Sequence, residues 1–168
     1  WVPVATTIGQ AGELLTLLVI LPFALPRLGV RKTIAIGILA WPIRYAIFSL
    51  GQPTGLIIAA LPLHGICYVF FFIVGQVYVD KLAPAHIRAS AQSLYFQVVF
   101  GLGLFLGSYF VGWIQNMFTD TSVQPSVINY QGLFLVPCLL TIVCAVMFFL
   151  FFKDPEEIKT EAPVQETK

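Results

Sequence analysis

Long apolar stretches that are almost free of charge restrict the fold of this chain more than any other feature. A transmembrane helix needs about 20 mostly apolar residues. Five stretches meet that requirement, namely residues 5–25, 33–50, 55–79, 89–117 and 132–152. Only 10% of the residues are charged, whereas about a quarter are charged in a typical water-soluble domain. The sequence therefore predicts an all-α membrane protein with five transmembrane helices.

Cysteines and catalytic motifs argue against several other classes of protein. Cys67, Cys138 and Cys144 all lie inside apolar stretches, where a thiol usually behaves as a small hydrophobic group. We therefore expect no disulfide scaffold, no metal site and no cofactor. The sequence contains neither a serine nucleophile motif nor a zinc-binding HExxH pattern, so we expect no enzyme. A net charge of +1 gives no reason to expect nucleic-acid binding.

Positive charge is distributed unevenly between the two predicted sides of the membrane. Threading the five spans alternately puts eight of the nine lysines and arginines on one side, in residues 26–32, 80–88 and 153–168. Because cytoplasmic loops are enriched in lysine and arginine, we expect that side to be cytoplasmic. The chain would then begin outside and end inside. Residues 153–168 are polar and are expected to form a disordered cytoplasmic tail.

Three ionisable residues lie at membrane depth on three successive predicted helices: Glu13, Arg44 and His64. A charged side chain there costs about 2.5 to 3.5 kcal/mol on insertion scales, so it usually has a partner and a function. Glu13 is the only acid inside any span, and we therefore expect it to pair with Arg44. Gln10 precedes Glu13 by three residues, which puts both on one helical face. These four residues are the candidates for a polar site.

Each of these residues also has an ordinary structural explanation. Glu13 could be a neutral acid near the outer interface, and Arg44 could extend toward that interface. His64 could be a hydrogen-bonded packing residue. None of these explanations needs a ligand. The convergence of three such residues favours the functional interpretation.

Aromatic and glycine patterns are less specific. Tyr68, Phe71 and Phe72 follow His64 and are suited either to plain packing or to contact with a flat ligand. Gly103 and Gly107 form a small-xxx-small pattern, which is typical of close helix packing in lipid and predicts a structural seam.

Several of these motifs together resemble the carboxyl-terminal half of a major facilitator superfamily transporter, and within it the nucleoside:proton symporter family. The loops 26–32 (PRLGVRK) and 80–88 (DKLAPAHIR) resemble the superfamily's cytoplasmic loops. More specific to the family are residues 9–13 (GQAGE), 41–45 (WPIRY), 63–68 (LHGICY) and 130–132 (YQG). The resemblance covers nearly all of residues 5–152.

The resemblance implies that residues 1–152 form part of the carboxyl-terminal bundle, helices eight to twelve of twelve. An amino-terminal bundle of the same protein would be the missing partner, and the protein would lie in the bacterial inner membrane. The implied function is import of nucleosides with protons by alternating access, with the proton as coupling ion. The resemblance implies that Gln10 and Glu13 contact the substrate and that Arg44 and His64 lie in the polar core of the site. On physical grounds we also expect substrate contacts from the aromatic residues Tyr68, Phe71 and Phe72, which are suited to stacking against a base. We expect proton coupling from Glu13, His64 and Arg44.

One position departs from the family's pattern, which has an aspartate directly after Tyr68 where this chain has Val69. Two alternatives therefore stay open beside nucleoside import. The first is a sugar or oligosaccharide:proton symporter, and the second is a membrane scaffold or pseudo-transporter that binds a solute without carrying it.

Overall fold

A computed structural model describes residues 2–122 and 126–152, so the predicted tail at 153–168 lies outside the described part. Almost every described residue is helical, as expected for backbone that must satisfy its hydrogen bonds internally when it lies in lipid. The α-helical segments are α1 (Val2–Leu15), α2 (Leu21–Leu50), α3 (Thr54–Ala60), α4 (Leu63–Tyr68), α5 (Val74–Leu82), α6 (Arg88–Phe96), α7 (Gly103–Met117) and α8 (Tyr130–Phe151). Two short antiparallel strands, β1 (Thr119–Asp120) and β2 (Val127–Ile128), form a hairpin before α8.

Continuous helices in the described residues include four that are long and apolar enough to cross a membrane, at Val4–Leu50, Thr54–Leu82, Arg88–Met117 and Tyr130–Phe151. The last three correspond to the predicted spans 55–79, 89–117 and 132–152. The first covers both of the predicted spans 5–25 and 33–50. The helical membrane fold is confirmed, whereas the number of five spans is approximate.

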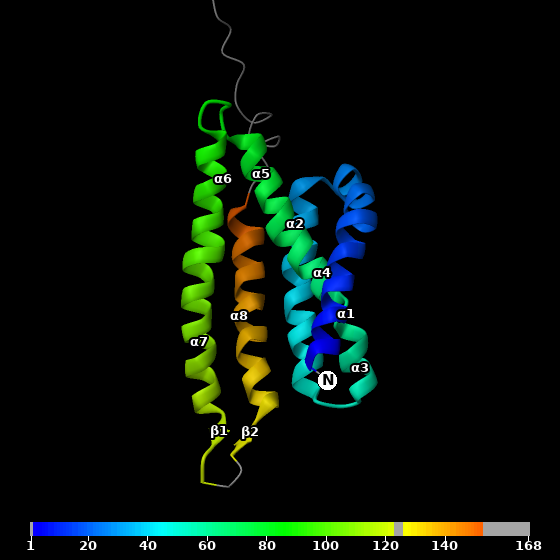
Figure 1. Ribbon diagram of the computed structural model, residues 1–168, viewed down its shortest axis with the longest axis vertical. Helices are drawn as coiled ribbons and strands as arrows, with labels where there is room; N and C mark the ends of the chain where they lie inside the picture. Colours follow the sequence, from blue (N-terminus) through cyan, green and yellow to red (C-terminus); the bar gives the residue numbers. More distant parts are fainter. Residues whose placement is uncertain (1, 123–125, 153–168) are drawn as a thin grey trace, which may run out of the picture.

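A break at Gly29 divides the first long helix into two arms. Gly29 has φ 74° and ψ 174°, which is not helical, and glycine adopts a positive φ without a steric penalty. The chain reverses direction near this residue, so that α1 and the later part of α2 run in opposite directions (Figure 1). The sequence predicted a loop at this place because residues 26–32 are polar.

Charged loops gather at one end of the bundle. The Gly29 reversal and the turn between α5 and α6 lie at the same end, opposite the β-hairpin (Figure 1). We call the first end the basic end, since the residues at or near its two chain reversals include Arg27, Arg31, Lys32, Lys81 and Arg88, and we call the other the hairpin end.

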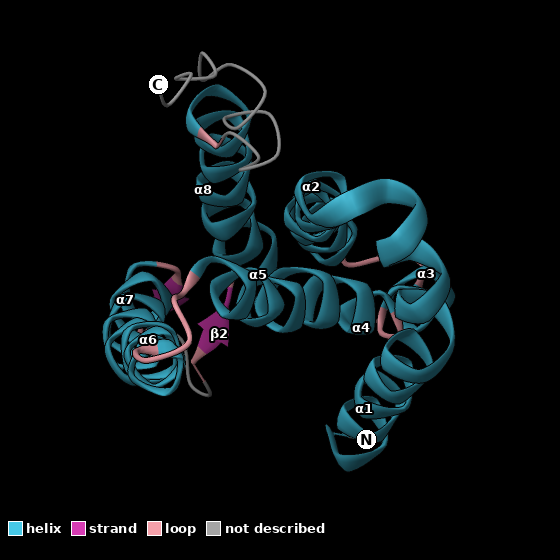
Figure 2. Cartoon of the chain, turned by 90° about the horizontal axis from the view of Figure 1, so that it is seen from above, coloured by secondary structure: helices cyan, strands magenta, loops and turns pink. Residues whose placement is uncertain are grey.

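The core lies where α2 packs against α8, α4 and α5, and Figure 2 shows α2 close to these helices. Its buried residues are apolar and come from several helices, namely Leu21, Val30, Ile34, Ile38, Val69, Phe70, Val74 and Ala145. Helices α6 and α7 stand to one side of this core (Figure 1), and Tyr109 on α7 is 79% exposed. Such exposed apolar surface is what a helix in contact with lipid or with further protein presents.

Three π-helical turns interrupt the long helices of the described residues, at η1 (Thr16–Ile20), η2 (Val69–Ile73) and η3 (Gln97–Leu102). Such turns leave backbone carbonyls without their usual helical partner, and they are frequent at functional sites. At η2 the Tyr95 hydroxyl donates a hydrogen bond to the Phe72 carbonyl over 3.0 Å. This bond ties α6 to the helix that carries His64.

Candidate functional site

Two glycines bring α1 and α4 into direct backbone contact beside the polar residues. A Cβ at Gly65 would lie 2.1 Å from the Gly12 carbonyl oxygen, and a Cβ at Gly12 would lie 2.6 Å from the Pro62 carbonyl oxygen. Both distances are too short for real atoms, so only glycine permits the crossing. Because Glu13 follows Gly12 and His64 precedes Gly65, the crossing places these two side chains next to each other.

The helix between α3 and α4 is interrupted at Pro62, whose ring removes a backbone donor. Tight turns close the gap, since the amides of His64 and Gly65 donate to the carbonyls of Leu61 and Pro62, both over 3.0 Å. The interruption therefore fixes the backbone from which the His64 side chain extends toward α1.

His64 joins Glu13 to Arg44 through its two ring nitrogens. His64 Nε2 lies 2.9 Å from Glu13 Oε1, and Arg44 Nη1 lies 3.1 Å from His64 Nδ1. Arginine can only donate hydrogen bonds, so Nδ1 must accept and the ring proton of a neutral His64 must be on Nε2, where it donates to the carboxylate. The geometry thus assigns the tautomer of His64.

This arrangement corrects one expectation from the sequence, which was a direct pair between Glu13 and Arg44. The contacts run instead from Glu13 to His64 and from His64 to Arg44. The physical reason is the close approach of α1 to α4, which brings the imidazole within hydrogen-bonding distance of the acid.

Aromatic rings surround the Arg44 guanidinium. Its Cζ lies 4.9 Å from the centre of the Phe48 ring and 6.0 Å from that of Trp41, distances at which a cation is attracted to a ring face. Arg44 Nε is buried and has no hydrogen-bond partner among the described residues. A buried donor without a partner is costly, so this nitrogen is left unsatisfied in the present arrangement.

A cavity of about 390 Å³ opens on this chain of polar groups. Its lining includes Gln10, Glu13, Arg44 and His64, and small-molecule sites typically enclose about 300 to 1,000 Å³. The other lining residues come from α1 and the interruption before α4, namely Ala5, Thr6, Gly9 and Leu61. Thr6 is not among the site residues predicted from the sequence, although its spacing of four from Gln10 puts both on one helical face.

The aromatic candidates lie beside this cavity without lining it. Tyr68 is the nearest, with its ring centre 6.1 Å from that of His64. Phe72 lies 5.1 Å from Tyr68 and 5.2 Å from Phe100 on η3, and Phe71 packs against the apolar core. The structure thus groups Gln10, Glu13, Arg44 and His64 around one cavity and leaves the three aromatic residues in an adjoining cluster.

Val69 points away from the cavity into the apolar core, where it is only 2% exposed. A carboxylate at this position in the present fold would lie in an apolar core of aliphatic and aromatic side chains. The described residues contain no group of three or more His, Cys, Asp or Glu side chains placed to hold a metal ion.

The cavity brings together acid, imidazole, guanidinium and amide groups. Such groups are suited to binding a neutral polyhydroxylated solute and to holding a proton.

Comparisons with known proteins agree on one family. A sequence profile for the family described as "Nucleoside H+ symporter" matches residues 2–157. The chain is 31% identical to a putative nucleoside transporter, YegT, of Escherichia coli K12, covering 95% of this chain and 39% of that protein. It is 34% identical to the xanthosine permease of the same organism, covering 91% of this chain and 36% of that protein.

A solved structure gives the same result. The crystal structure of the nucleoside transporter NupG is similar with a TM-score of 0.82 and 32% sequence identity, covering 89% of this chain and 37% of that chain. The present chain therefore spans between about a third and two fifths of the length of these relatives.

Proposed function

The chain belongs to the nucleoside H⁺ symporter family, and from this premise we propose that its parent protein imports nucleosides together with protons. The family is one of transporters of the membrane, and the apolar helices of the chain suit an integral membrane protein. The observation that carries the proposal is the chain of contacts Glu13–His64–Arg44 on the wall of a cavity that Gln10 also lines.

Nucleoside binding fits the chemistry of that wall. Ribose hydroxyls both donate and accept hydrogen bonds, and the Gln10 amide and the Glu13 carboxylate supply the matching groups. The Arg44 guanidinium also lines the cavity and carries further donors. A base extending toward Tyr68 would reach the edge of the aromatic cluster, which suits stacking against a flat ring.

Proton coupling follows from the tautomer of His64. If Nδ1 takes a proton, it becomes a donor that faces the Arg44 donor, so that contact must open. If Glu13 takes the proton instead, the Nε2–H of His64 loses a charged acceptor. Either event changes the groups that line the cavity. Proton binding then changes the affinity for the substrate, and substrate binding changes the affinity for the proton by the same factor. Alternating access would move this bundle against the other part of the protein around the site.

Orientation and location complete the proposal. The basic end would face the cytoplasm, because lysine and arginine favour that side, and the hairpin end would face outward. The parent protein would lie in the bacterial inner membrane, its amino-terminal bundle would supply the opposite wall of the cavity, and the proton would be the only coupling ion with no further cofactor.

Uptake of labelled uridine or adenosine by cells expressing the full-length parent tests the proposal. We expect Glu13→Gln to abolish accumulation driven by a proton gradient while exchange of substrate at equal concentrations continues. Asp120→Asn makes the same chemical change at the exposed hairpin and should leave accumulation unchanged. Normal accumulation in Glu13→Gln would remove Glu13 from the mechanism.

Competition and reconstitution separate the proposal from its alternatives. Excess unlabelled nucleoside should block uptake, and free sugars or oligosaccharides should not. Inhibition by sugars alone would identify a sugar symporter. Nucleoside binding without transport in proteoliposomes would identify a protein that binds without carrying.

A further inference from the structure

A second hollow of the surface lies at the basic end, where the chain reverses at Gly29. It has a volume of about 440 Å³ and is lined by Val19, Ile20, Phe23, Ala24, Arg27 and Leu28. It shares no residue with the cavity around His64. We call this hollow the reversal groove.

The walls of the reversal groove are apolar and open to the surroundings. Phe23 is 61% exposed, Val19 is 48% exposed and Leu28 is 36% exposed. These residues belong to the end of η1 and the first turns of α2, next to the break at Gly29 that divides the long apolar helix Val4–Leu50. Exposed apolar walls suit hydrocarbon rather than water.

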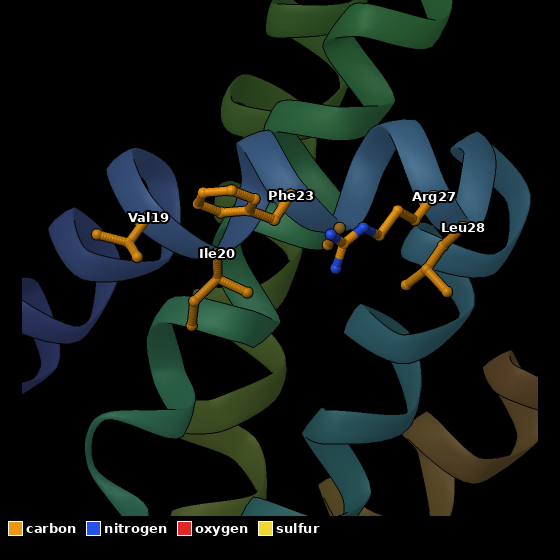
Figure 3. Close-up of a pocket in the computed structure, with 6 residues that line it drawn as sticks. Val19, Ile20, Phe23, Arg27 and Leu28 are labelled. Atoms are coloured by element: carbon orange, nitrogen blue, oxygen red, sulfur yellow. The ribbon is translucent and has the colours of Figure 1, made fainter.

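One charged side chain enters this apolar surface. Figure 3 shows that the Arg27 side chain extends from the reversal back over the groove, with its guanidinium between Phe23 and Leu28. Within the described part of the chain, Arg27 takes part in no ion pair or hydrogen bond. A guanidinium stays charged and presents a planar fork of donors that matches a phosphate group.

The charge of the residues next to the groove also favours an anion as its occupant. Residues 26–32 contain three cations, Arg27, Arg31 and Lys32, and no acid lies between Glu13 and Asp80. An occupant of the groove therefore needs a negative group at its head and an apolar tail beneath it. Basic pockets between membrane helices are known to hold anionic lipid head groups.

We propose that the reversal groove binds an anionic phospholipid. The lipid phosphate contacts the Arg27 guanidinium, and the upper part of an acyl chain lies along Val19, Ile20 and Phe23. This site is independent of nucleoside transport, because it depends only on the residues of the groove and on the location of the chain in a membrane.

Native mass spectrometry of the full-length parent in detergent, with added phosphatidylglycerol or phosphatidylcholine, tests the proposal. We expect phosphatidylglycerol to bind more tightly than phosphatidylcholine. Arg27→Gln should weaken the affinity for phosphatidylglycerol about five-fold, the loss expected for one cation near an anionic lipid. Lys81→Gln is the matched control, because it removes one exposed cation from the last turn of α5, at the other chain reversal of the basic end, and should have little effect.

A second pair of variants tests the acyl-chain contact. Phe23→Ser should weaken lipid binding, whereas Phe105→Ser on α7, where the ring is 70% exposed, should not. Glycerol phosphate in excess should fail to displace the lipid, because it lacks an acyl chain.

Three outcomes would overturn the proposal. Equal losses of phosphatidylglycerol affinity in Arg27→Gln and Lys81→Gln would show that the lipid responds to general surface charge and not to this groove. Displacement by glycerol phosphate would identify a simple anion site. Unchanged lipid binding in Arg27→Gln, together with cross-linking of Phe23→Cys to an upstream segment, would show that protein and not lipid covers the groove.

Discussion

His64 is the residue on which the geometry of the polar site depends. It accepts a hydrogen bond from Arg44 and donates one to Glu13, so each of the two charged groups is satisfied through the same ring. Removing the ring would leave both partners partly buried without that contact. Losing a hydrogen bond to a charged group costs about 1.5 to 3 kcal/mol.

The first prediction compares His64→Leu with His64→Gln in the full-length parent. His64→Leu should reduce nucleoside binding about 10-fold or more, the factor that corresponds to that free energy. His64→Gln should retain most of the binding, because its amide supplies one donor and one acceptor in place of the ring. It should nevertheless lose proton-driven accumulation, since the amide does not titrate between pH 5 and 8.

Equilibrium binding and uptake measured across that pH range check both parts of this prediction. A His64→Gln variant that accumulates substrate with normal pH dependence would show that His64 only positions its neighbours.

Asp120, at the hairpin end, offers a second prediction for a single residue. The Ser122 hydroxyl and the Ser122 amide both donate to its carboxylate, the amide over 2.9 Å, and these bonds lower the pKa of Asp120. Because the pKa is lowered, these hydrogen bonds stabilise the hairpin fully at pH values above the ordinary carboxyl pKa. This stabilisation is lost as the pH falls through the lowered pKa.

Ser122→Ala should therefore raise the pKa of Asp120 toward its ordinary value, because the hydroxyl is the largest cause of the shift. Ser126→Ala, on the other side of the same loop, serves as the control. Carboxyl-carbon NMR of aspartate-labelled parent protein measures the titration directly. Identical titration curves in both variants would contradict the assigned hydrogen bonds.

At the scale of helices, the crossing of α1 and α4 sets the distance between acid and imidazole. The spacing of Gly103 and Gly107 predicts a packing seam on α7. Within the described residues, however, a Cβ at Gly107 would meet nothing within 4 Å. The close backbone contact occurs instead between Gly12 and Gly65. These glycines lie on different helices, so the spacing within one stretch of sequence does not show that they meet.

The third prediction concerns that crossing. Gly65→Ala should force α1 and α4 apart, since the new methyl would overlap the Gly12 carbonyl, and overpacking of this kind costs about 1 to 3 kcal/mol. We expect a lower melting temperature and weaker proton-driven uptake. Gly55→Ala on α3 is the control, because a Cβ there has open space and alanine favours a helix by about 1 kcal/mol over glycine.

Thermal unfolding of the detergent-solubilised parent, followed by size-exclusion chromatography, measures both variants. Equal melting temperatures would show that the two helices separate without cost and that the crossing does not fix the site.

At the scale of the whole molecule, the two ends differ in charge. Among the described residues, the chain reversals of the basic end are flanked by five cations, Arg27, Arg31, Lys32, Lys81 and Arg88, whereas the hairpin of the other end carries the acid Asp120. This asymmetry, with α-helices connecting the two ends (Figure 1), is the physical basis for the proposed orientation.

The fourth prediction tests that orientation by labelling single cysteines in intact bacteria. A membrane-impermeant maleimide should modify Ser122→Cys directly and should modify Lys81→Cys only after the cells are opened. Cys144→Ser supplies the background, because Cys144 is the exposed cysteine of the described residues. The reverse order of labelling would invert the proposed topology.

The sequence by itself determined the helical membrane fold and singled out four polar residues that line one cavity, Gln10, Glu13, Arg44 and His64. These features are local, because span length and hydropathy are properties of a continuous stretch of chain and a buried charge is conspicuous within it. Only the tertiary structure placed His64 between Glu13 and Arg44, turned Val69 into the apolar core and set the aromatic residues beside the cavity. Those placements depend on how helices distant in sequence cross, and the crossing is decided by backbone contacts such as the one between Gly12 and Gly65.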